Sequence, residues 1–154
     1  MAAEERIVAA ERVVAAEAAE IFELIADPAR QPEWDGNGNL TAAGAGQRVR
    51  AVGDVFTMTI HTGEVRENRI VEFVEGRRIA WLPSPVGLPE PGHLWRWELE
   101  PLASGGTLVR HGYDWSGLTD ETRFARARAN TAEALRASID RLAGLVETAD
   151  DPRR

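Results

Sequence analysis

The sequence predicts an α+β fold in which an antiparallel β-sheet wraps around one long C-terminal helix. Short glycine-containing turns separate several β-rich runs between residues 54 and 115, which is typical of an antiparallel meander. Residues 119–147, by contrast, hold no proline and a single late glycine. The helix predicted there is the only element able to cover the apolar face of such a sheet.

Length and composition limit the classes of protein to consider. A chain of 154 residues fits one domain with its own core, which we expect to span residues 1–148, with a frayed tail at 149–154. The net charge of −7 argues against nucleic-acid binding. The lack of cysteine excludes disulfides and thiolate metal sites. No signal peptide or membrane span is recognisable, so we expect a cytoplasmic protein, as a monomer or a homodimer.

The N-terminal part predicts one strand and one helix. Residues 6–14, "RIVAAERVV", are rich in β-branched side chains and indicate a strand. The following "AEAAEIFELIA" carries apolar side chains at helical spacing, namely Ala18, Ile21, Phe22 and Ile25.

Residues 26–36, "ADPARQPEWDG", predict a second and very short helix. Asp27 is suited to capping free backbone N–H groups, and Pro28 to the first helical position. Pro32 limits that helix to barely a turn. Trp34 follows, just before the glycine-rich "DGNGN". It is either a plug in the core or part of the wall of a binding site.

The middle of the chain predicts the meander itself. A weak strand at 40–43 and firmer ones at 54–61, 64–74, 77–83, 93–102 and 107–115 are joined by turns such as "HTGE", "VEGRR" and "ASGGT". The link at 83–92 contains four prolines, which disfavour a strand or helix there. With Val86 and Leu88 it is either a lid or a tolerated insertion.

The last segment predicts a helix of about 28 residues, capped at Thr119 or Asp120, because no breaker interrupts it. One side of that helix carries Phe124, Ala127, Thr131, Leu135, Ser138, Leu142 and Leu145.

Three stretches carry a resemblance to a known family: "IFELIADPARQPEWD", "HLWRWELEPLASGGTLVRHGYDW" and the long C-terminal helix. With them the chain resembles the START-like, or Bet v 1-like, superfamily, and within it the bacterial polyketide cyclase/dehydrase-type proteins of the SRPBCC group. The resemblance implies a helix-grip fold, with seven strands gripping the final helix around an apolar cavity. It extends to aromatase/cyclases, to carriers of lipids or quinones, and to co-chaperone domains. Oxygenase subunits with a mononuclear iron are set aside, because the three histidines lack paired spacing.

Strand alternation and the small residues of the helix together raise the possibility of a cavity. Alternation places Trp95 and Trp97 on one face, and His111, Tyr113 and Trp115 on one face of the next strand. Small helix residues opposite leave volume unless the tryptophans or a ligand fill it. The expected ligand-contacting residues are Trp34, Phe56, Met58, Trp81, Leu88, Trp95, Trp97, Trp115, Ala127, Asn130, Thr131 and Ala134.

Tyr113 and His111 are the candidate catalytic residues. A phenol can donate to a carbonyl and an imidazole can move a proton, which suits enolisation, cyclisation or dehydration. The alternative is that both are ordinary core residues with satisfied polar tips.

Other polar residues carry weaker expectations. Arg126, next to Asn130, is able to hold a carboxylate, although a solvated helix flank is the commoner role. Glu67 or Arg69 projects inward only if no bulge changes the face of their strand. His61 is expected opposite the inward face, and His93 at the surface or at the cavity mouth.

The sequence therefore predicts a protein that binds a small hydrophobic or aromatic molecule, with no metal and no cofactor. If it is an enzyme, the resemblance implies cyclisation, dehydration or aromatisation by acid–base chemistry. The alternatives are a non-catalytic lipid or quinone carrier and a co-chaperone-like interaction module.

Overall fold

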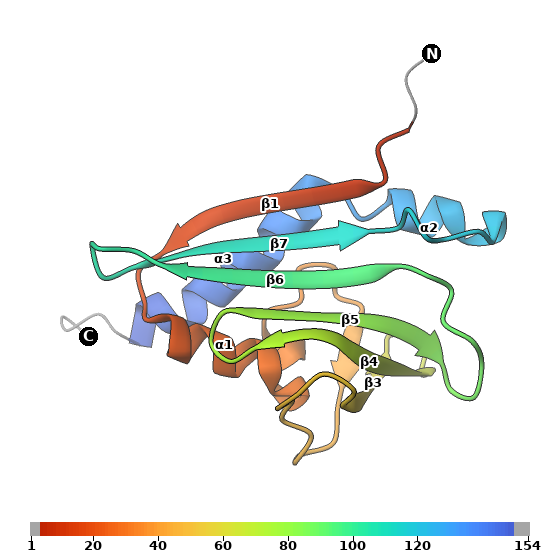
Figure 1. Ribbon diagram of the computed structural model, residues 1–154, viewed down its shortest axis with the longest axis horizontal. Coiled ribbons are helices and arrows are strands. Elements are labelled where there is room, and N and C mark those ends of the chain that lie inside the picture. The colour runs from red at the N-terminus through yellow and green to blue at the C-terminus, as the bar shows by residue number, and fades with distance from the viewer. Residues whose placement is uncertain (1–3, 150–154) are drawn as a thin grey trace.

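The computed structural model describes residues 4–149 (Figure 1). It confirms the predicted seven-stranded antiparallel sheet with a C-terminal helix and short helices. The elements in chain order are β1 (Ile7–Val14), α1 (Ala18–Ala26), η1 (Pro28–Glu33), β2 (Leu40–Ala42), β3 (Val55–Ile60), β4 (Val65–Val74), β5 (Arg78–Pro85), β6 (Leu94–Pro101), β7 (Thr107–Asp114), η2 (Glu121–Arg123), α2 (Phe124–Arg128) and α3 (Ala132–Ala149).

The sheet has the strand order β1-β7-β6-β5-β4-β3-β2, so the first strand pairs with the last. In Figure 1, α3 runs behind β1, β7 and β6, and α1 lies below them. The main core forms where these layers meet. It is built from buried side chains of α1, of the sheet and of α3, among them Ile21, Phe22, Ile25, Ile79, Trp97, Val109, Ile139 and Leu142.

The prediction of one continuous C-terminal helix from Thr119 is wrong, because the helix breaks between α2 and α3. Thr131 stands at the break, and its hydroxyl accepts a 3.2 Å hydrogen bond from the backbone N–H of Ala134. Threonine favours this capping geometry over a position inside a helix. Because α3 begins anew at Ala132, the residues of α3 that face the sheet cannot be found by continuing the helical spacing of α2. Residues 150–154 of the predicted frayed tail lie outside the residues that the structure describes.

The predicted strand at 77–83 continues further than expected, because Ser84 and Pro85 also lie within β5 and pair with β4. The pairing of β5 with β6 ends at Trp81 and Trp95. Beyond that point one side of β5 lacks a strand partner, and proline is tolerated at such an edge because no N–H is required there.

A bulge in β4 reverses the face expected for its first half. Ile70 pairs with Trp81 and Glu72 with Ala80, so the register shifts by one residue between them. As a result Arg66 and Asn68 lie on the inner side, while Arg69 is exposed. Residues 65, 67 and 69 cannot share a face with residue 73 across such a shift.

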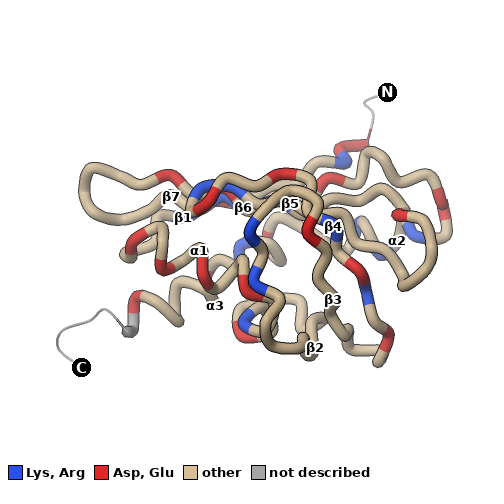
Figure 2. The backbone as a smooth tube through the Cα atoms, turned by 60° about the horizontal axis from the view of Figure 1, so that its bottom comes forward, with Lys and Arg blue, Asp and Glu red and all other residues tan. Residues whose placement is uncertain are grey.

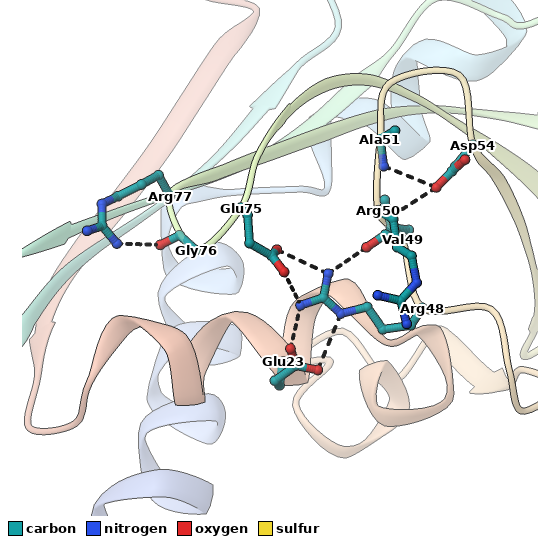
Figure 3. Close-up of polar contacts among 9 residues, drawn as sticks. All are labelled: Glu23, Arg48, Val49, Arg50, Ala51, Asp54, Glu75, Gly76 and Arg77. Carbon is teal, nitrogen blue, oxygen red and sulfur yellow. Dashed lines mark hydrogen bonds and ion pairs between the residues drawn. The ribbon is translucent and has the colours of Figure 1, made fainter.

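Arg48 connects three segments that are distant in sequence (Figure 3). Its guanidinium pairs with Glu23 of α1 and, at 2.9 Å, with Glu75 in the turn after β4. It also donates to the backbone carbonyl of Val49 and lies over the ring of Phe22. The side chain is 16% exposed, so the pairing is partly shielded from water. Arg48 thereby fixes the loop before β3 against α1.

Candidate functional site

A cavity of about 350 Å³ lies between the inner face of the sheet, the loop after η1, and the η2–α2–α3 segment. This volume falls within the range of small-molecule sites in proteins. Its walls are formed by Gln31, Trp34, Asp35, Asn37, Asn39, Leu40, Phe56, Met58, Ile60, His61, Arg66, Asn68, Trp81, Pro83, His93, Trp95, His111, Tyr113, Leu118, Arg123, Arg126, Ala127, Ala129, Asn130 and Ser138.

Aromatic rings make up much of the sheet side of this cavity. Phe56 and Trp81 meet edge to face with centroids 5.4 Å apart, and Trp95 lies 4.4 Å from Tyr113. Each ring is held by a neighbour, so the wall is rigid. The structure places nine of the residues singled out from the sequence along the cavity: Trp34, Phe56, Met58, Trp81, Trp95, His111, Tyr113, Ala127 and Asn130.

Trp34 serves as a core residue and as part of the wall. Its indole N–H donates a 2.8 Å hydrogen bond to the carbonyl of Leu24, and its ring meets Trp97 edge to face at 5.1 Å. Only 3% of the residue is exposed, yet it lines the cavity. The two roles considered from the sequence, a plug in the core and part of the wall of a binding site, are therefore compatible for Trp34.

The polar loop after Trp34 is organised by Asp35. Its carboxylate accepts hydrogen bonds from the backbone N–H groups of Asn37, Asn39 and Leu40, at 2.7 to 3.2 Å. The carbonyl of the same residue accepts one from Arg141 of α3. Asp35 is thus committed to shaping the loop, which leads the chain from η1 across α3 into β2.

His111 is buried against the rings of Trp97 and Trp95, with centroids 3.7 and 5.6 Å away. Burial lowers the pKa of His111 to about 4, although its bond to a backbone carbonyl acts in the opposite sense. At neutral pH the ring is uncharged. Since Nδ1 lies 3.0 Å from the carbonyl of Arg96, Nδ1 carries the proton and Nε2 is left as an acceptor.

Tyr113 and His93 form a second polar group at the cavity. Burial raises the pKa of Tyr113 to about 12, against a lowering effect of its hydrogen bond with Asn130. The phenol is consequently a proton donor at neutral pH. The ring of His93 lies 6.0 Å from that of Tyr113. Burial, assisted by Arg123, Arg126 and Arg66, lowers the pKa of His93 to about 4.

Arginines and amides surround the exposed end of the cavity. Arg66 of β4, Arg123 of η2 and Arg126 of α2 all line it, as do amides from the loop after Trp34 and Asn130 at the break between α2 and α3. Arg66 and Asn68 were not singled out from the sequence, because strand alternation alone does not locate the bulge in β4. His61 also lines the cavity, contrary to expectation: β3 ends at Ile60, so strand alternation no longer applies.

Five predicted contact residues do not line the cavity, each for a structural reason. Trp97 lies deeper, under Trp34 and His111. Trp115 follows the end of β7 and packs on Phe124 beneath Arg6. Leu88 is exposed on the loop after β5. Thr131 and Ala134 lie at and just after the break between α2 and α3, which turns them away from the cavity, and Thr131 is exposed.

The proline-containing loop after β5 is held on the outer face of the sheet. The backbone N–H of Gly87 donates to the carboxylate of Glu67 at 3.1 Å, and Arg69 pairs with Glu90 at 2.7 Å. Leu88 is 61% exposed and lines a shallow outer groove with Arg69 and Glu90. Glu67 and Arg69 therefore secure the loop on the face of β4 opposite to Arg66 and Asn68.

The described part of the chain offers neither a cluster of metal ligands nor a membrane-spanning helix. Within residues 4–149, no group of three or more His, Asp or Glu side chains is placed to hold a metal ion. In the same part of the chain, none of the helices has the length and apolar character needed to cross a membrane.

Comparison with known proteins agrees with the resemblance seen in the sequence. The model of a family described as "Polyketide cyclase / dehydrase and lipid transport" matches residues 5–147. The chain is 31% identical over 137 residues to the uncharacterized protein MT0096 of Mycobacterium tuberculosis (strain CDC 1551 / Oshkosh). That alignment covers 82% of this chain and 59% of the relative. The chain thus spans well under two thirds of the length of the relative.

Solved structures share the fold at low sequence identity. Protein MLL2253 from Mesorhizobium loti superposes with a TM-score of 0.71 at 18% identity, covering 95% of this chain and 100% of that one. A START superfamily protein from Mycobacterium smegmatis gives a TM-score of 0.64 at 17% identity, over 94% and 99% of the two chains. The START-like fold is thereby confirmed.

Proposed function

We propose that this chain, which belongs to the polyketide cyclase/dehydrase and lipid transport family, binds a small apolar or aromatic molecule in its internal cavity. The observation that carries the proposal is a space of about 350 Å³ beside the rings of Trp34, Phe56, Trp81 and Trp95. Native interiors seldom keep a volume of this size without a function. An interaction module without a ligand would instead be expected to fill its core.

A neutral-probe titration tests this binding. N-phenyl-1-naphthylamine is an uncharged aromatic molecule whose emission rises in apolar surroundings. Ala129→Phe places a ring at an exposed position of the cavity lining, and Ala125→Phe makes the same change on α2 away from the lining. We expect saturable binding with one molecule per chain, weakened about tenfold or more by Ala129→Phe and unchanged by Ala125→Phe. Absence of saturable binding, or equal loss in both variants, would rule the proposal out.

A second candidate function, acid–base catalysis, is favoured by one further observation. Tyr113, His93 and His111 line the same cavity, with a protonated phenol and neutral imidazoles at physiological pH. In this candidate the phenol donates to a ligand carbonyl and Nε2 of His111 takes a proton from the adjacent carbon, as in enolisation. A pure lipid carrier has no need of three such groups.

Deuterium exchange tests the catalytic candidate without knowledge of the natural substrate. The probe is 1-tetralone, an aryl ketone whose α-protons exchange slowly in D₂O, followed by NMR. We expect the protein to accelerate exchange and Tyr113→Phe to remove most of the acceleration, because the donor to the carbonyl is lost. A thermal unfolding curve verifies that the variant is folded. Exchange at the buffer rate with wild-type protein would leave binding alone as the function.

A further inference from the structure

We infer that the molecule bound in the cavity is an amphipathic acid, with its apolar part against the aromatic wall and a carboxylate-like or other oxyanion group at the mouth beside Arg126. This inference rests on the proposed function, since it specifies the ligand of the same site.

The local charge at the cavity is opposite to that of the whole protein. The chain has 25 acidic and 18 Lys or Arg residues, but among the described residues 4–149 the cavity is lined by three arginines and one carboxylate. That carboxylate, Asp35, already accepts three backbone hydrogen bonds. A local excess of positive charge in an acidic protein is a feature that attracts an anion.

The three arginines that line the cavity have no carboxylate within 3.4 Å in the part of the chain that the structure describes, apart from the 3.4 Å contact of Arg66. Arg66 lies 3.4 Å from Glu64, and Arg123 lies 3.6 Å from Asp120. Within residues 4–149, no ion pair or side-chain hydrogen bond involves the guanidinium of Arg126. Several arginines on other surfaces have close carboxylate partners, as in Arg96–Glu72 at 2.6 Å and Arg69–Glu90 at 2.7 Å.

Arg128, two residues further along α2, provides the most direct contrast. Its guanidinium makes a bidentate pair with Glu4, at 2.7 and 3.0 Å, and it does not line the cavity. Arg126 instead faces the space that Tyr113, His93 and Asn130 also line. The same short helix thus carries one arginine paired with a carboxylate and one whose N–H donors are open to a ligand.

The three arginines also lie close enough to the cavity to influence the pKa of His93, which lines it. Arg123, Arg126 and Arg66 each contribute to the lowered pKa of His93, after burial. In Figure 2, α2 with its blue arginine segments lies at the same end of the molecule as the β3–β4 hairpin. Aromatic side chains line the inner part of the cavity, so an amphipathic acid matches both parts, and guanidinium groups bind oxyanions in a bidentate manner.

Two probes with one scaffold test the inference. N-phenyl-1-naphthylamine is neutral, and 1-anilinonaphthalene-8-sulfonate adds a sulfonate to the same ring system. We expect the sulfonate to bind more tightly to the wild-type protein. Arg126→Gln should weaken sulfonate binding about tenfold, as expected for the loss of a charged hydrogen-bond partner, with little change for the neutral probe. Arg128→Gln, the matched control, should change neither affinity.

The outcomes separate the inference from the proposed function. Equal affinity for the two probes, with no effect of Arg126→Gln, overturns the anionic group while ligand binding stands. Equal losses in Arg126→Gln and Arg128→Gln indicate a general effect of surface charge, and also overturn it. Failure of both probes to bind removes the proposed function itself. A loss confined to Arg126→Gln and to the sulfonate supports the inference.

Discussion

The backbone N–H of Gly36 donates a 2.9 Å hydrogen bond to the hydroxyl of Ser138, which lies 102 positions later in the chain. This contact joins the loop after Trp34 to α3 at the cavity wall. The approach is unusually close, because a Cβ built on Gly36 would lie 2.7 Å from the backbone nitrogen of Ser138. The loop reaches α3 only because residue 36 lacks a side chain.

Replacing Gly36 by alanine should therefore destabilise the protein. A Cβ in contact with the backbone of α3 forces the loop to move, at a cost of about 1–3 kcal/mol for an overpacked site. Urea unfolding measures the free energy directly. Gly44→Ala is the control, because a Cβ there meets no atom within 4 Å. Equal stability of the two variants would contradict the role given to the close approach.

Loss of Arg48 should loosen the contact between α1 and the loop before β3. Arg48→Met keeps much of the aliphatic stem but removes the pairs with Glu23 and Glu75. Both glutamates are largely exposed, so we expect a loss of about 1 kcal/mol and not more, because solvent screens such pairs. Arg77→Met is the matched control, since Arg77 bonds only the neighbouring Gly76 carbonyl (Figure 3). Equal effects in chemical denaturation would refute a special role for Arg48.

Thr131 should contribute to the stability of α3 and not to ligand affinity. Thr131→Ala removes the hydroxyl that accepts from Ala134, which should cost about 1 kcal/mol as for other helix N-caps. Affinity for the neutral naphthylamine should stay within twofold. Thr119→Ala, in the exposed segment before η2, serves as the comparison. A large loss of probe binding in Thr131→Ala would restore the ligand contact that the sequence predicted.

Two histidines should make stability fall as the pH is lowered. The folded-state pKa values of His93 and His111 are about 4, below the ordinary value of 6.5. The unfolded chain therefore takes up protons first, and stability present above pH 6.5 is lost progressively toward pH 4. Each histidine contributes at most about 1.4 kcal/mol per pH unit. Urea titrations at pH 5 to 7 should show this slope, and it should be smaller in His93→Gln. An unchanged slope would contradict the assignment.

The sequence was sufficient for the fold because its signals were local and mutually consistent. Glycine turns bounded the strands, and Asp27 with Pro28 marked the start of η1, where the carboxylate of Asp27 does accept from Ala29. The helix break at Thr131 was missed because one threonine in a helix-forming context is a weak signal by itself. The extension of β5 to Pro85 was missed because proline tolerance depends on where the pairing with β6 ends.

Prediction of the cavity lining failed where alternation was extended past an irregularity. Glu67 and Arg69 lie on the outer face, as the surface alternative for them predicted, because of the bulge near Val71. Arg66 and Asn68, which line the cavity instead, were not singled out, and neither was the inward position of His61 at the end of β3. A bulge has no reliable sequence signature, so strand phase cannot be carried through ten residues on periodicity alone. The aromatic residues were easier to place, since large rings on regular strand segments face the core.

The pairing of β1 with β7 has a consequence for the order of folding events. Val14 lies opposite Thr107 and Ile7 opposite Asp114, so this ladder closes a loop of most of the chain, with a large entropic cost. Hairpins such as β3–β4 and β6–β7 close much shorter loops. We expect pulse-labelled hydrogen exchange during refolding to protect the amides of β1 after those of β6. The strand that precedes the other six in this sequence is then among the last to be secured.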